Sequence, residues 1–352
     1  MHCLPTFYNP ANAGIWSYTP DLRLLATQAE AYRKTHHLKP VASDRTKKVT
    51  LLLIDVQRDF CFPEGTLYVG GRSGTGAIDD NQRIAEFIYR EMSGITSIVS
   101  TLDTHWPFQI FTPSFWEDQD GQMLLPHDMI DGSLSIIRAG KTVGKAKPRM
   151  AVASIVSGGN YAALLKQAQY SCQKLEQGGK YLLYIWPEHC VLGTTGHSMA
   201  GIVHEAVMFH SYVRMAQPGF EVKGGHPLSE NYSVLGPEVR EYYNGQPLAQ
   251  KNVRFLDTLL ASDAVIIAGQ AASHCVKSTI DDLIVEIQAR DPSQADKVYI
   301  MADGSSAVAV PDGRGGFAVD FTDEAAAALS RYEAAGMHIV RSTDPMSSWL
   351  KN

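Results

Sequence analysis

Cys275 has the sequence setting of a cysteine nucleophile. In the run AVIIAGQAASHCVKST, an apolar segment ends at Gly269, small residues follow, and Cys275 stands where a helix is expected to begin. The free N–H groups and the partial positive charge at a helix N-terminus favour the thiolate over the thiol. The same N–H groups, together with those of the turn through Ala271, can hold the oxyanion of a tetrahedral intermediate. The alternative is a small buried apolar residue, which is how most free cysteines behave.

Two charged residues can assist a thiol of this kind. Asp55 ends the apolar run LLLID, where a carboxylate can act first as general base to the thiol and then as acid to a leaving amine. Lys223, in GFEVKGGHP, is expected to follow a stretch of loop and to lie between the other two as a cation that stabilises the thiolate. The alternatives are a turn-capping aspartate and a solvated surface lysine.

A third set of residues has the types of a metal site. Asp103 and His105, in STLDTHWPF, are separated by one residue, so both side chains point the same way on an extended strand end. His189, in WPEHC, can supply a third ligand. Two histidines and one carboxylate with open positions suit zinc, iron or manganese, acting as a Lewis acid or as an anchor for the substrate.

The composition favours a small molecule as the partner. Charged residues make up 19% of the chain and hydrophobic residues 45%, an ordinary globular balance. The net charge of -6 argues against nucleic acid and anionic membranes, which require a basic face. The five cysteines follow no disulfide or CxxC spacing, so reduced thiols are expected. The chain shows no apolar stretch of membrane-spanning length and no signal-peptide order at its N-terminus, so we expect a cytoplasmic protein.

The residues that carry this chemistry require a sheet to position them. Short, nearly continuous apolar runs recur and suit a parallel sheet covered on both faces. Helix-period segments lie between several of them, most clearly at 78–91 and 276–289. The alternation predicts an α/β fold, a doubly wound, mainly parallel six-stranded sheet with helices on both faces. In such sheets ligands gather beyond the carboxyl ends of the strands, where most of the residues above are expected to lie. The expected strands are 49–55, 97–103, 181–186, 264–269, 298–302 and 337–341.

Two segments fall outside the expected sheet. Residues 1–47 contain one expected helix, at 22–32, and are interpreted as an N-terminal arm that packs on the domain or on a neighbouring subunit. Residues 117–179, with an expected helix at 160–175, are interpreted as an insertion. The domain itself is then a single one that covers residues 48–352 and contains this insertion.

Five pieces of the sequence, taken together and in order, resemble the nicotinamidase branch of the isochorismatase-like cysteine hydrolases. They are LLLIDVQRDF, TLDTHWPF followed by PSF, WPEHCVLGTTG, EVKGG and GQAASHCVKST. The similarity extends from about residue 48 to residue 341, and WPEHC with its following GT and glycine is the most specific piece.

The resemblance implies a role for each matching residue. It implies a triad of Asp55, Lys223 and Cys275, a nonproline cis peptide just before Ala271, and oxyanion donors at the amides of Ala271 and Cys275. It implies that Phe60 and Trp186 sandwich an aromatic ring. It also implies that the metal is held by Asp103, His105 and His189. The chemistry implied is a thioester acyl-enzyme from which ammonia leaves before water attacks, and the assembly implied is a homo-oligomer.

The chain departs from the family pattern at three places. Some members have a further histidine six residues after the histidine of the DxH pair, and Phe111 stands there in this chain. Residues 272–274 are Ala, Ser and His in place of a threonine-aspartate-aromatic run, and TTGH replaces TPGA after WPEHC. The chain is also longer than most members because of residues 117–179, a segment that can cover the pocket or select another substrate.

The sequence therefore predicts a metal-assisted amidohydrolase that converts nicotinamide, or a related small heteroaromatic amide, to the acid and ammonia. One alternative keeps the chemistry and changes the substrate to another small amide, a carbamoyl compound or a ureido compound. The other alternative is a non-catalytic relative that binds a metabolite.

Overall fold

The computed structural model describes residues 2–44, 47–178 and 181–351, which form two compact units. Unit 1 comprises residues 1–102, 198–221 and 253–352. Unit 2 comprises residues 103–197 and 222–252.

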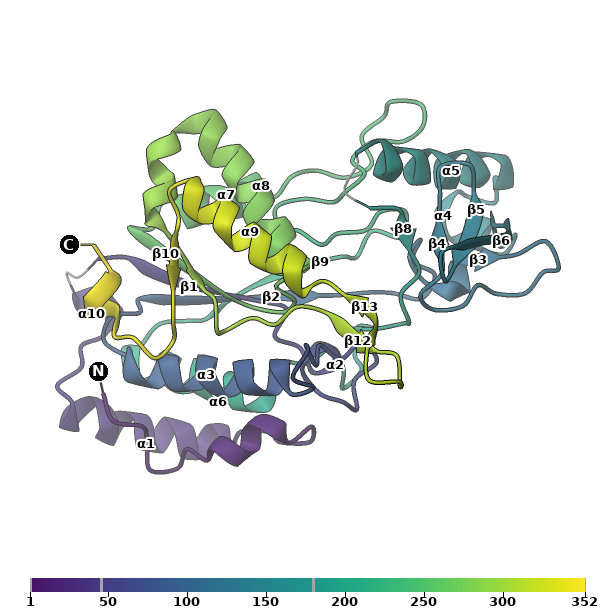
Figure 1. The fold of residues 1–352 in the computed structure, drawn as a ribbon. Coiled ribbons are helices and arrows are strands. Elements are labelled where there is room, and N and C mark those ends of the chain that lie inside the picture. Colours follow the sequence, from purple (N-terminus) through teal and green to yellow (C-terminus); the bar gives the residue numbers. More distant parts are fainter. Residues whose placement is uncertain (1, 45–46, 179–180, 352) are drawn as a thin grey trace. The chain divides into compact units, whose positions relative to one another are not determined.

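A six-stranded sheet organises unit 1 and confirms the predicted doubly wound α/β fold. Its strand order is β14-β11-β10-β1-β2-β9. The chain winds outward from β1 through β2 to β9 and then restarts at β10 on the other side, so the winding direction reverses between β1 and β10. Figure 1 shows α3 and α6 on one face of the sheet and α8 and α9 on the other. The strands are β1 (Val49–Ile54), β2 (Ser97–Asp103), β9 (Gly219–Lys223), β10 (Ala264–Gly269), β11 (Val298–Met301) and β14 (His338–Val340).

The two central strands explain why the apolar runs are the clearest signal in the sequence. Every residue of β1 and of β10 is buried, and the two strands pair in parallel from Val49 opposite Ala264 to Ile54 opposite Gly269. A strand that is covered on both faces has no solvent-facing side, so its sequence is continuously apolar.

The predicted strand at 181–186 is not part of this sheet, which is a correction. Leu183–Tyr184 (β8) instead pairs with β4 at the edge of an antiparallel sheet in unit 2. The sixth strand of the large sheet is β9, which was not predicted, so Lys223 is the last residue of a strand and does not follow a stretch of loop. The prediction failed because β9 alternates and exposes Phe220 and Val222, so it lacks a continuous apolar run. Leu183, Ile185 and Trp186 are buried within unit 2, where β8 pairs with β4, and not in the large sheet.

The four predicted helices are present with slightly different ends. They are α1 (Leu22–Thr35), α3 (Gly76–Arg90), α5 (Tyr161–Gln177) and α8 (Cys275–Arg290). The remaining helices and the hairpin of unit 1 are α2 (Arg58–Cys61), α6 (Gly201–Arg214), α7 (Val253–Leu260), α9 (Thr322–Ala334), α10 (Met346–Trp349), β12 (Ala309–Pro311) and β13 (Phe317–Asp320).

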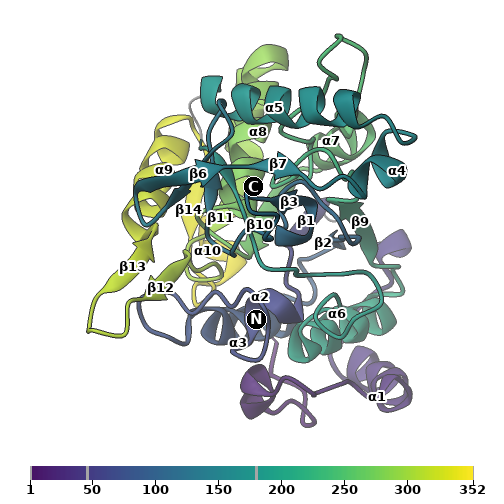
Figure 2. The ribbon, with the colours of Figure 1, turned by 90° about the vertical axis from the view of Figure 1, so that its right-hand side faces the viewer.

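Residues 2–44 pack on unit 1 through α1 and the turns before it. Helix α1 lies along α6, as Figures 1 and 2 show from two sides. The side chain of Asp21 caps α1 by accepting from the amides of Arg23 and Leu24. The buried guanidinium of Arg58 donates to the backbone carbonyls of Trp16 and Tyr18, so these turns are held by a charged hydrogen-bond donor.

Unit 2 contains the segment that the sequence analysis interprets as an insertion. Its antiparallel sheet has the order β6-β5-β4-β8, and a separate pair joins β3 to β7. Its elements besides α5 and β8 are β3 (Trp116–Glu117), β4 (Met129–Ile130), β5 (Ser135–Arg138), β6 (Lys141–Lys145), β7 (Lys147–Pro148) and α4 (Val152–Val156).

The helices of residues 2–44, 47–178 and 181–351 are all too short or too polar to traverse a lipid bilayer.

The packing of the N-terminal turns on α6 leaves no room for a side chain at Gly201. A Cβ atom there would lie 2.1 Å from the carbonyl oxygen of Tyr18. We expect Gly201→Ala to lower the free energy of unfolding by roughly 1–3 kcal/mol, because the backbone of residues 16–19 has to shift. Urea unfolding followed by circular dichroism measures this. Gly144→Ala is the matched control, since a Cβ at Gly144 meets nothing within 4 Å. Equal stability of the two variants would contradict the account.

Candidate active site

Cys275 is the first residue of α8 and follows the turn that leaves β10. Its side chain is buried, with 6% of the residue exposed. The peptide bond between Gln270 and Ala271 is cis, as the resemblance predicted. Within the turn, the amide of Ala272 donates to the carbonyl of Ser306, and the amides of residues 274 and 276 donate to the carbonyl of Ala271. The oxyanion role of the amides of Ala271 and Cys275 stays a prediction.

The turn between β10 and α8 packs closely against the end of β1, because Gly269 has no side chain and Gln270 forms two hydrogen bonds. Gly269 has a φ of 122°, and a Cβ there would lie 2.1 Å from the carbonyl oxygen of Ile54. The amide of Gln270 donates to that same oxygen over 2.7 Å. Its side-chain Nε2 donates to Oδ2 of Asp80, 3.0 Å away on α3. Asp80 was not singled out in the sequence, because an aspartate within an amphipathic helix carries no local signal of this contact.

Asp55 lies directly after β1 and faces the nucleophile. An oxygen of its carboxylate and Sγ of Cys275 lie within 4.8 Å of each other. The hydroxyl of Thr101 on β2 donates to Oδ1 of Asp55, and the amide of Asp55 donates back to that hydroxyl over 3.0 Å. The backbone of Asp55 has a φ of 47°, in the left-handed region. Unit 1 thus brings together the predicted base and the predicted nucleophile across the two central strands.

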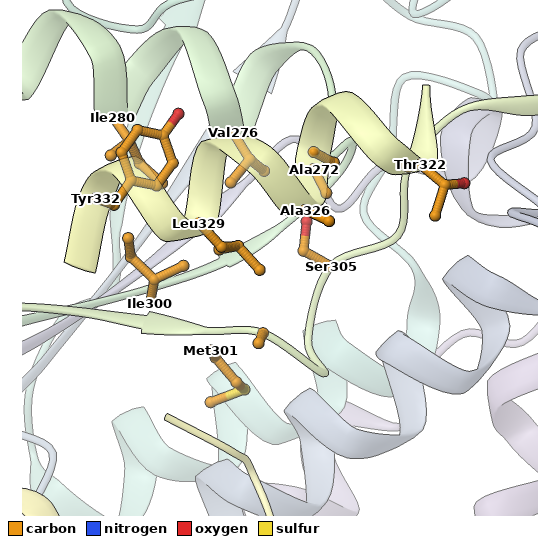
Figure 3. Close-up of a pocket in the computed structure, with 13 residues that line it drawn as sticks. Ala272, Val276, Ile280, Ile300, Met301, Ser305, Thr322, Ala326, Leu329 and Tyr332 are labelled. Carbon is orange, nitrogen blue, oxygen red and sulfur yellow. The ribbon is translucent and has the colours of Figure 1, made fainter. Parts of the chain in front are cut away.

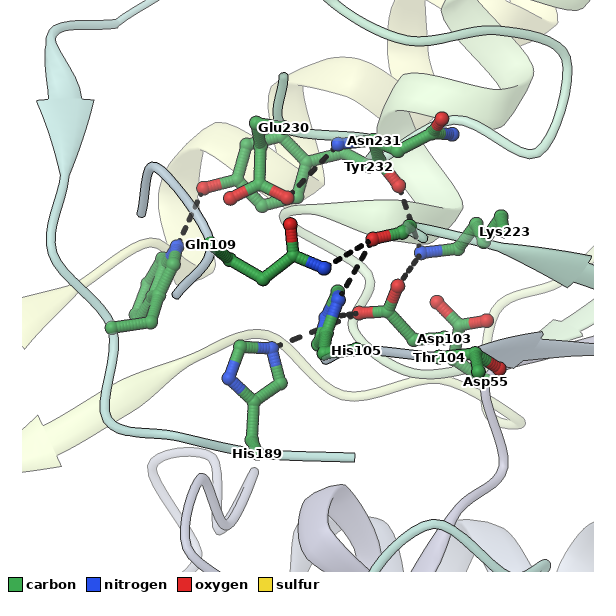
Figure 4. Close-up of polar contacts among 12 residues, drawn as sticks. Asp55, Asp103, Thr104, His105, Gln109, His189, Lys223, Glu230, Asn231 and Tyr232 are labelled. Atoms are coloured by element: carbon green, nitrogen blue, oxygen red, sulfur yellow. Dashed lines mark hydrogen bonds and ion pairs between the residues drawn. The ribbon is translucent and has the colours of Figure 1, made fainter. Parts of the chain in front are cut away.

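In unit 2, the three predicted metal ligands lie together. Ligand atoms of Asp103, His105 and His189 all lie within 4.8 Å of one another, and all three residues are buried. Nε2 of His105 is 2.9 Å from Oδ2 of Asp103, and Nε2 of His189 is 3.7 Å from the same oxygen. Figure 4 shows both rings turned toward this carboxylate.

The hydrogen-bond partner of Nδ1 in each of the two histidines determines which ring nitrogen carries a proton. Nδ1 of His105 lies 3.1 Å from the carbonyl oxygen of Gly224, and Nδ1 of His189 lies 2.8 Å from that of Pro187. A carbonyl only accepts, so each Nδ1 carries a hydrogen. Burial lowers the pKa of His105, and the charge of Asp103 opposes this shift. Burial would also lower the pKa of His189, but its hydrogen bond to Asp103 and the charge of that carboxylate outweigh burial and raise it. Two imidazole nitrogens that converge on one carboxylate oxygen are a donor set that fits a divalent metal ion.

Lys223 is an integral member of this cluster. Its Nζ lies 2.9 Å from Oδ1 of Asp103 and donates to the carbonyl oxygen of Asn231 over 2.9 Å. Burial alone would raise the pKa of Asp103, but the charges of His105 and Lys223 outweigh it and hold the pKa well below its ordinary value. A lysine in this position is not a solvated surface group, so the alternative considered for Lys223 is wrong.

Two further polar residues of unit 2 were missed in the sequence. Glu230 is buried, and burial followed by the negative charge of Asp103 raises its pKa to about 8. Its Oε1 accepts from the amide of Asn231, the residue whose carbonyl receives Lys223. Gln109 donates to the carbonyl of Gly224, the same oxygen that orients His105. Both lie in segments without strand or helix periodicity, so no sequence pattern pointed to them.

The aromatic residues of the prediction are all buried. Phe111 packs edge-on against His105, with ring centroids 4.7 Å apart, and its centroid is 6.0 Å from that of His189. The indole of Trp186 donates to the hydroxyl of Tyr232 over 2.8 Å and packs on the ring of Tyr184. Phe60, on α2 of unit 1, is 6% exposed. The sandwich of an aromatic ring by Phe60 and Trp186 stays a prediction.

Comparison with known proteins gives structural likenesses only. No family model matches the chain, and no curated protein matches it in sequence. Similar solved structures include the Acinetobacter baumanii nicotinamidase pyrazinamidase, at 17% identity and a TM-score of 0.48, with 86% of this chain and 99% of that chain covered. The yeast nicotinamidase Pnc1p aligns at 18% identity and a TM-score of 0.45 over 83% of this chain and 99% of that one. The pyrazinamidase of Pyrococcus horikoshii in complex with zinc aligns at 17% identity and a TM-score of 0.41 over 84% and 99%. Likenesses of this size do not assign an activity, which has to come from the residues of the site.

Removal of one histidine tests the metal site. We expect the purified protein to bind one zinc, iron or manganese ion and His189→Ala to bind it at least about 100-fold more weakly, since even partners outside a ligand set contribute 10–100-fold. Competition with a chromogenic chelator measures the affinity. Phe111→Leu keeps an apolar side chain beside the same rings and is the control. A wild-type protein without stoichiometric metal binding would contradict the assignment.

Asp80 accepts a hydrogen bond from Gln270 in the turn before Cys275, and its contribution to the stability of the fold depends on pH. Burial raises the pKa of Asp80 to about 6, so the folded chain holds this proton to higher pH than the unfolded chain. Its contribution to stability is therefore complete below about pH 4 and falls as the pH rises through about 6. We expect the free energy of unfolding of Asp80→Asn, relative to wild type, to increase by roughly 2–3 kcal/mol from pH 4 to pH 7. Urea unfolding at the two pH values measures it, and a pH-independent difference would refute it.

Proposed function

We propose that this chain is a metal-assisted cysteine amidohydrolase that converts nicotinamide, or a closely related small heteroaromatic amide, to the acid and ammonia. The observation that carries the proposal is the approach of the Asp55 carboxylate to within 4.8 Å of Sγ of Cys275. A buried carboxylate and a buried thiol that lie this near each other have the residue types of a general base and a nucleophile.

In the proposed first step, Asp55 takes the proton of Cys275, and the sulfur attacks the carbonyl carbon of the amide. The amides of Ala271 and Cys275 stabilise the negative charge that develops on the carbonyl oxygen. Asp55 then returns the proton to the leaving nitrogen, so that ammonia departs and a thioester remains. A water molecule, deprotonated by the same carboxylate, attacks the carbonyl carbon of the thioester. The C–S bond then breaks, the acid leaves, and Asp55 returns the proton to the sulfur.

Lys223 is proposed to complete a triad with Asp55 and Cys275. Its support is its place at the carboxyl end of β9, in the same sheet as β1 and β10, and its burial as an ammonium group. In this role the positive charge favours the thiolate and keeps Asp55 ionised until it accepts the proton.

The metal ion and the aromatic residues are proposed to bind the substrate. Asp103, His105 and His189 would hold the ion, which supplies a Lewis acid that anchors the ring nitrogen of the amide or a water molecule. Trp186 is oriented by its hydrogen bond to Tyr232, and we propose that it and Phe60 flank the ring of the substrate. Phe111 supplies no ligand atom, so an ion held by these three residues would keep positions for water and substrate.

A different amide, a carbamoyl compound or a ureido compound is the second candidate substrate. The observation that favours it is the extent of unit 2, to which the segment at 117–179 contributes β4, β5, β6, β7, α4 and α5. This segment can select a substrate other than nicotinamide while the chemistry at Cys275 is unchanged.

Ammonia release from nicotinamide tests the proposal. We expect turnover in the presence of zinc, iron or manganese, and a loss of at least about 1000-fold in Cys275→Ala, because no other group supplies the nucleophile. A glutamate-dehydrogenase-coupled assay measures the ammonia. Cys3→Ala is the matched control, because Cys3 is an exposed thiol.

Three outcomes of this assay are decisive. No turnover of nicotinamide or pyrazinamide with any of the three metals would refute the substrate, and a panel of amides and ureido compounds then tests the second candidate. Full activity of Cys275→Ala would refute the mechanism. A mass increase on Cys275 that matches the acyl group, trapped by rapid acid quench, would support the thioester.

A further inference from the structure

A cavity of about 190 Å³ lies in unit 1 behind the segment that presents the nucleophile. Its walls come from α8, α9, the end of β11 and the turn after it (Figure 3). Val276, the neighbour of Cys275 on α8, lines this cavity. Successive residues of a helix point about 100° apart, so the first turn of α8 turns Val276 into the cavity and Cys275 toward Asp55. The cavity is thus separate from the space in which Cys275 acts.

The lining is apolar and carries no charge. Val276, Ile280, Ile300, Met301 and Leu329 supply most of it, with alanine side chains between them. None of the side chains that line the cavity belongs to Asp, Glu, Lys, Arg or His. An ionised ligand would lose its hydration there without a counter-charge, so the cavity suits an uncharged molecule.

Two hydroxyls of the lining, those of Ser305 and Thr322, are buried without a hydrogen-bond partner among the described residues, and the Ser305 hydroxyl is the one considered for a ligand. The oxygen of Ser305 is buried and has no hydrogen-bond partner among the residues that the structure describes. In Figure 3 it points to the side of the cavity that Ala272 and Ala326 form. Tyr332 differs, because its hydroxyl donates to Asp281 and only its ring faces the cavity. A buried hydroxyl without a partner is costly, and a ligand with one polar group would satisfy it.

The size of the cavity limits the ligand to about one ring. An engineered cavity of about 150 Å³ with an aliphatic and aromatic lining is large enough for benzene. Ala326 is exposed on α9 and also lines the cavity, so this side chain stands where the cavity meets solvent. A ligand can therefore enter without unfolding of the surrounding helices.

We propose that this cavity is a binding site for an uncharged, ring-sized molecule with one hydrogen-bonding group that pairs with Ser305. The proposal is independent of the amidohydrolase function, because no residue of the cavity takes part in the chemistry at Cys275.

Phenol is a suitable probe, and titration calorimetry on the full chain measures its binding. Cys275 is first alkylated with iodoacetamide, so that binding beside the sulfur is blocked. We expect one molecule of phenol to bind with a Kd on the order of millimolar, as is usual for ligands of this size. Benzoate, which has the same ring and a negative charge, should bind at least about tenfold more weakly.

Three substitutions test whether phenol binds in this cavity. Ala326→Phe puts a ring at the mouth of the cavity and should weaken phenol binding at least about tenfold. Ala327→Phe is the matched control, since Ala327 is exposed on the same helix and does not line the cavity. Ser305→Ala should weaken phenol binding about fivefold, the usual range for loss of one hydrogen bond, and leave toluene binding unchanged.

The proposal is overturned if phenol does not bind at about 10 mM, if benzoate binds equally well, or if Ala326→Phe and Ala327→Phe bind phenol alike. Should Ala326→Phe fail to fold, the comparison of phenol with toluene in Ser305→Ala decides. Equal binding of phenol by this variant and wild type would then refute the site.

Discussion

The ion pair between Asp103 and Lys223 is the interaction on which the site in unit 2 depends. Both side chains are buried, and a single charge left there would be strongly unfavourable. The pair also determines its neighbours, because the ionised Asp103 carboxylate draws both histidine rings toward one oxygen. Backbone carbonyls hold the far side of each ring. The result is two imidazole nitrogens and a carboxylate oxygen within 4.8 Å of one another, a donor set of the kind that binds zinc, iron or manganese.

The parallel sheet imposes a second constraint, and it explains how much of the site could be predicted. Carboxyl ends of parallel strands share one edge, so the apolar runs predict that the residues after β1 and β10 lie at the same edge of the sheet. The approach of Asp55 to Cys275 follows that logic. The DxH pair and His189 could likewise be selected by type and spacing, and their ligand atoms lie together. The cis peptide before Ala271 came from the resemblance alone, since no local pattern of residues specifies it.

What the sequence did not reveal depends on contacts between distant segments. The edge strand β9 has a half-exposed, alternating pattern that is typical of a loop as much as of a strand, and the short apolar run at 181–186 wrongly predicts a strand of the large sheet. Both errors have the same origin, because local hydrophobicity reports burial and not the partner that causes it. Residues far away in the sequence give Glu230 and Asp80 their polar surroundings: the charge of Asp103 acts on Glu230, and the side chain of Gln270 donates to Asp80. No sequence pattern indicates the cavity behind α8 either, because the residues that line it are of the types found in any apolar core.

The central claim is that Cys275 is an activated thiol whose reactivity depends on Asp55 and Lys223. The rate of its alkylation by iodoacetamide at pH 7, followed by mass spectrometry of the Cys275 peptide, tests this most directly. The account predicts a rate at least about tenfold above that of free cysteine, and a loss of most of this excess in Lys223→Met. A Cys275 that reacts no faster than free cysteine, or that reacts equally fast in Lys223→Met, would contradict it.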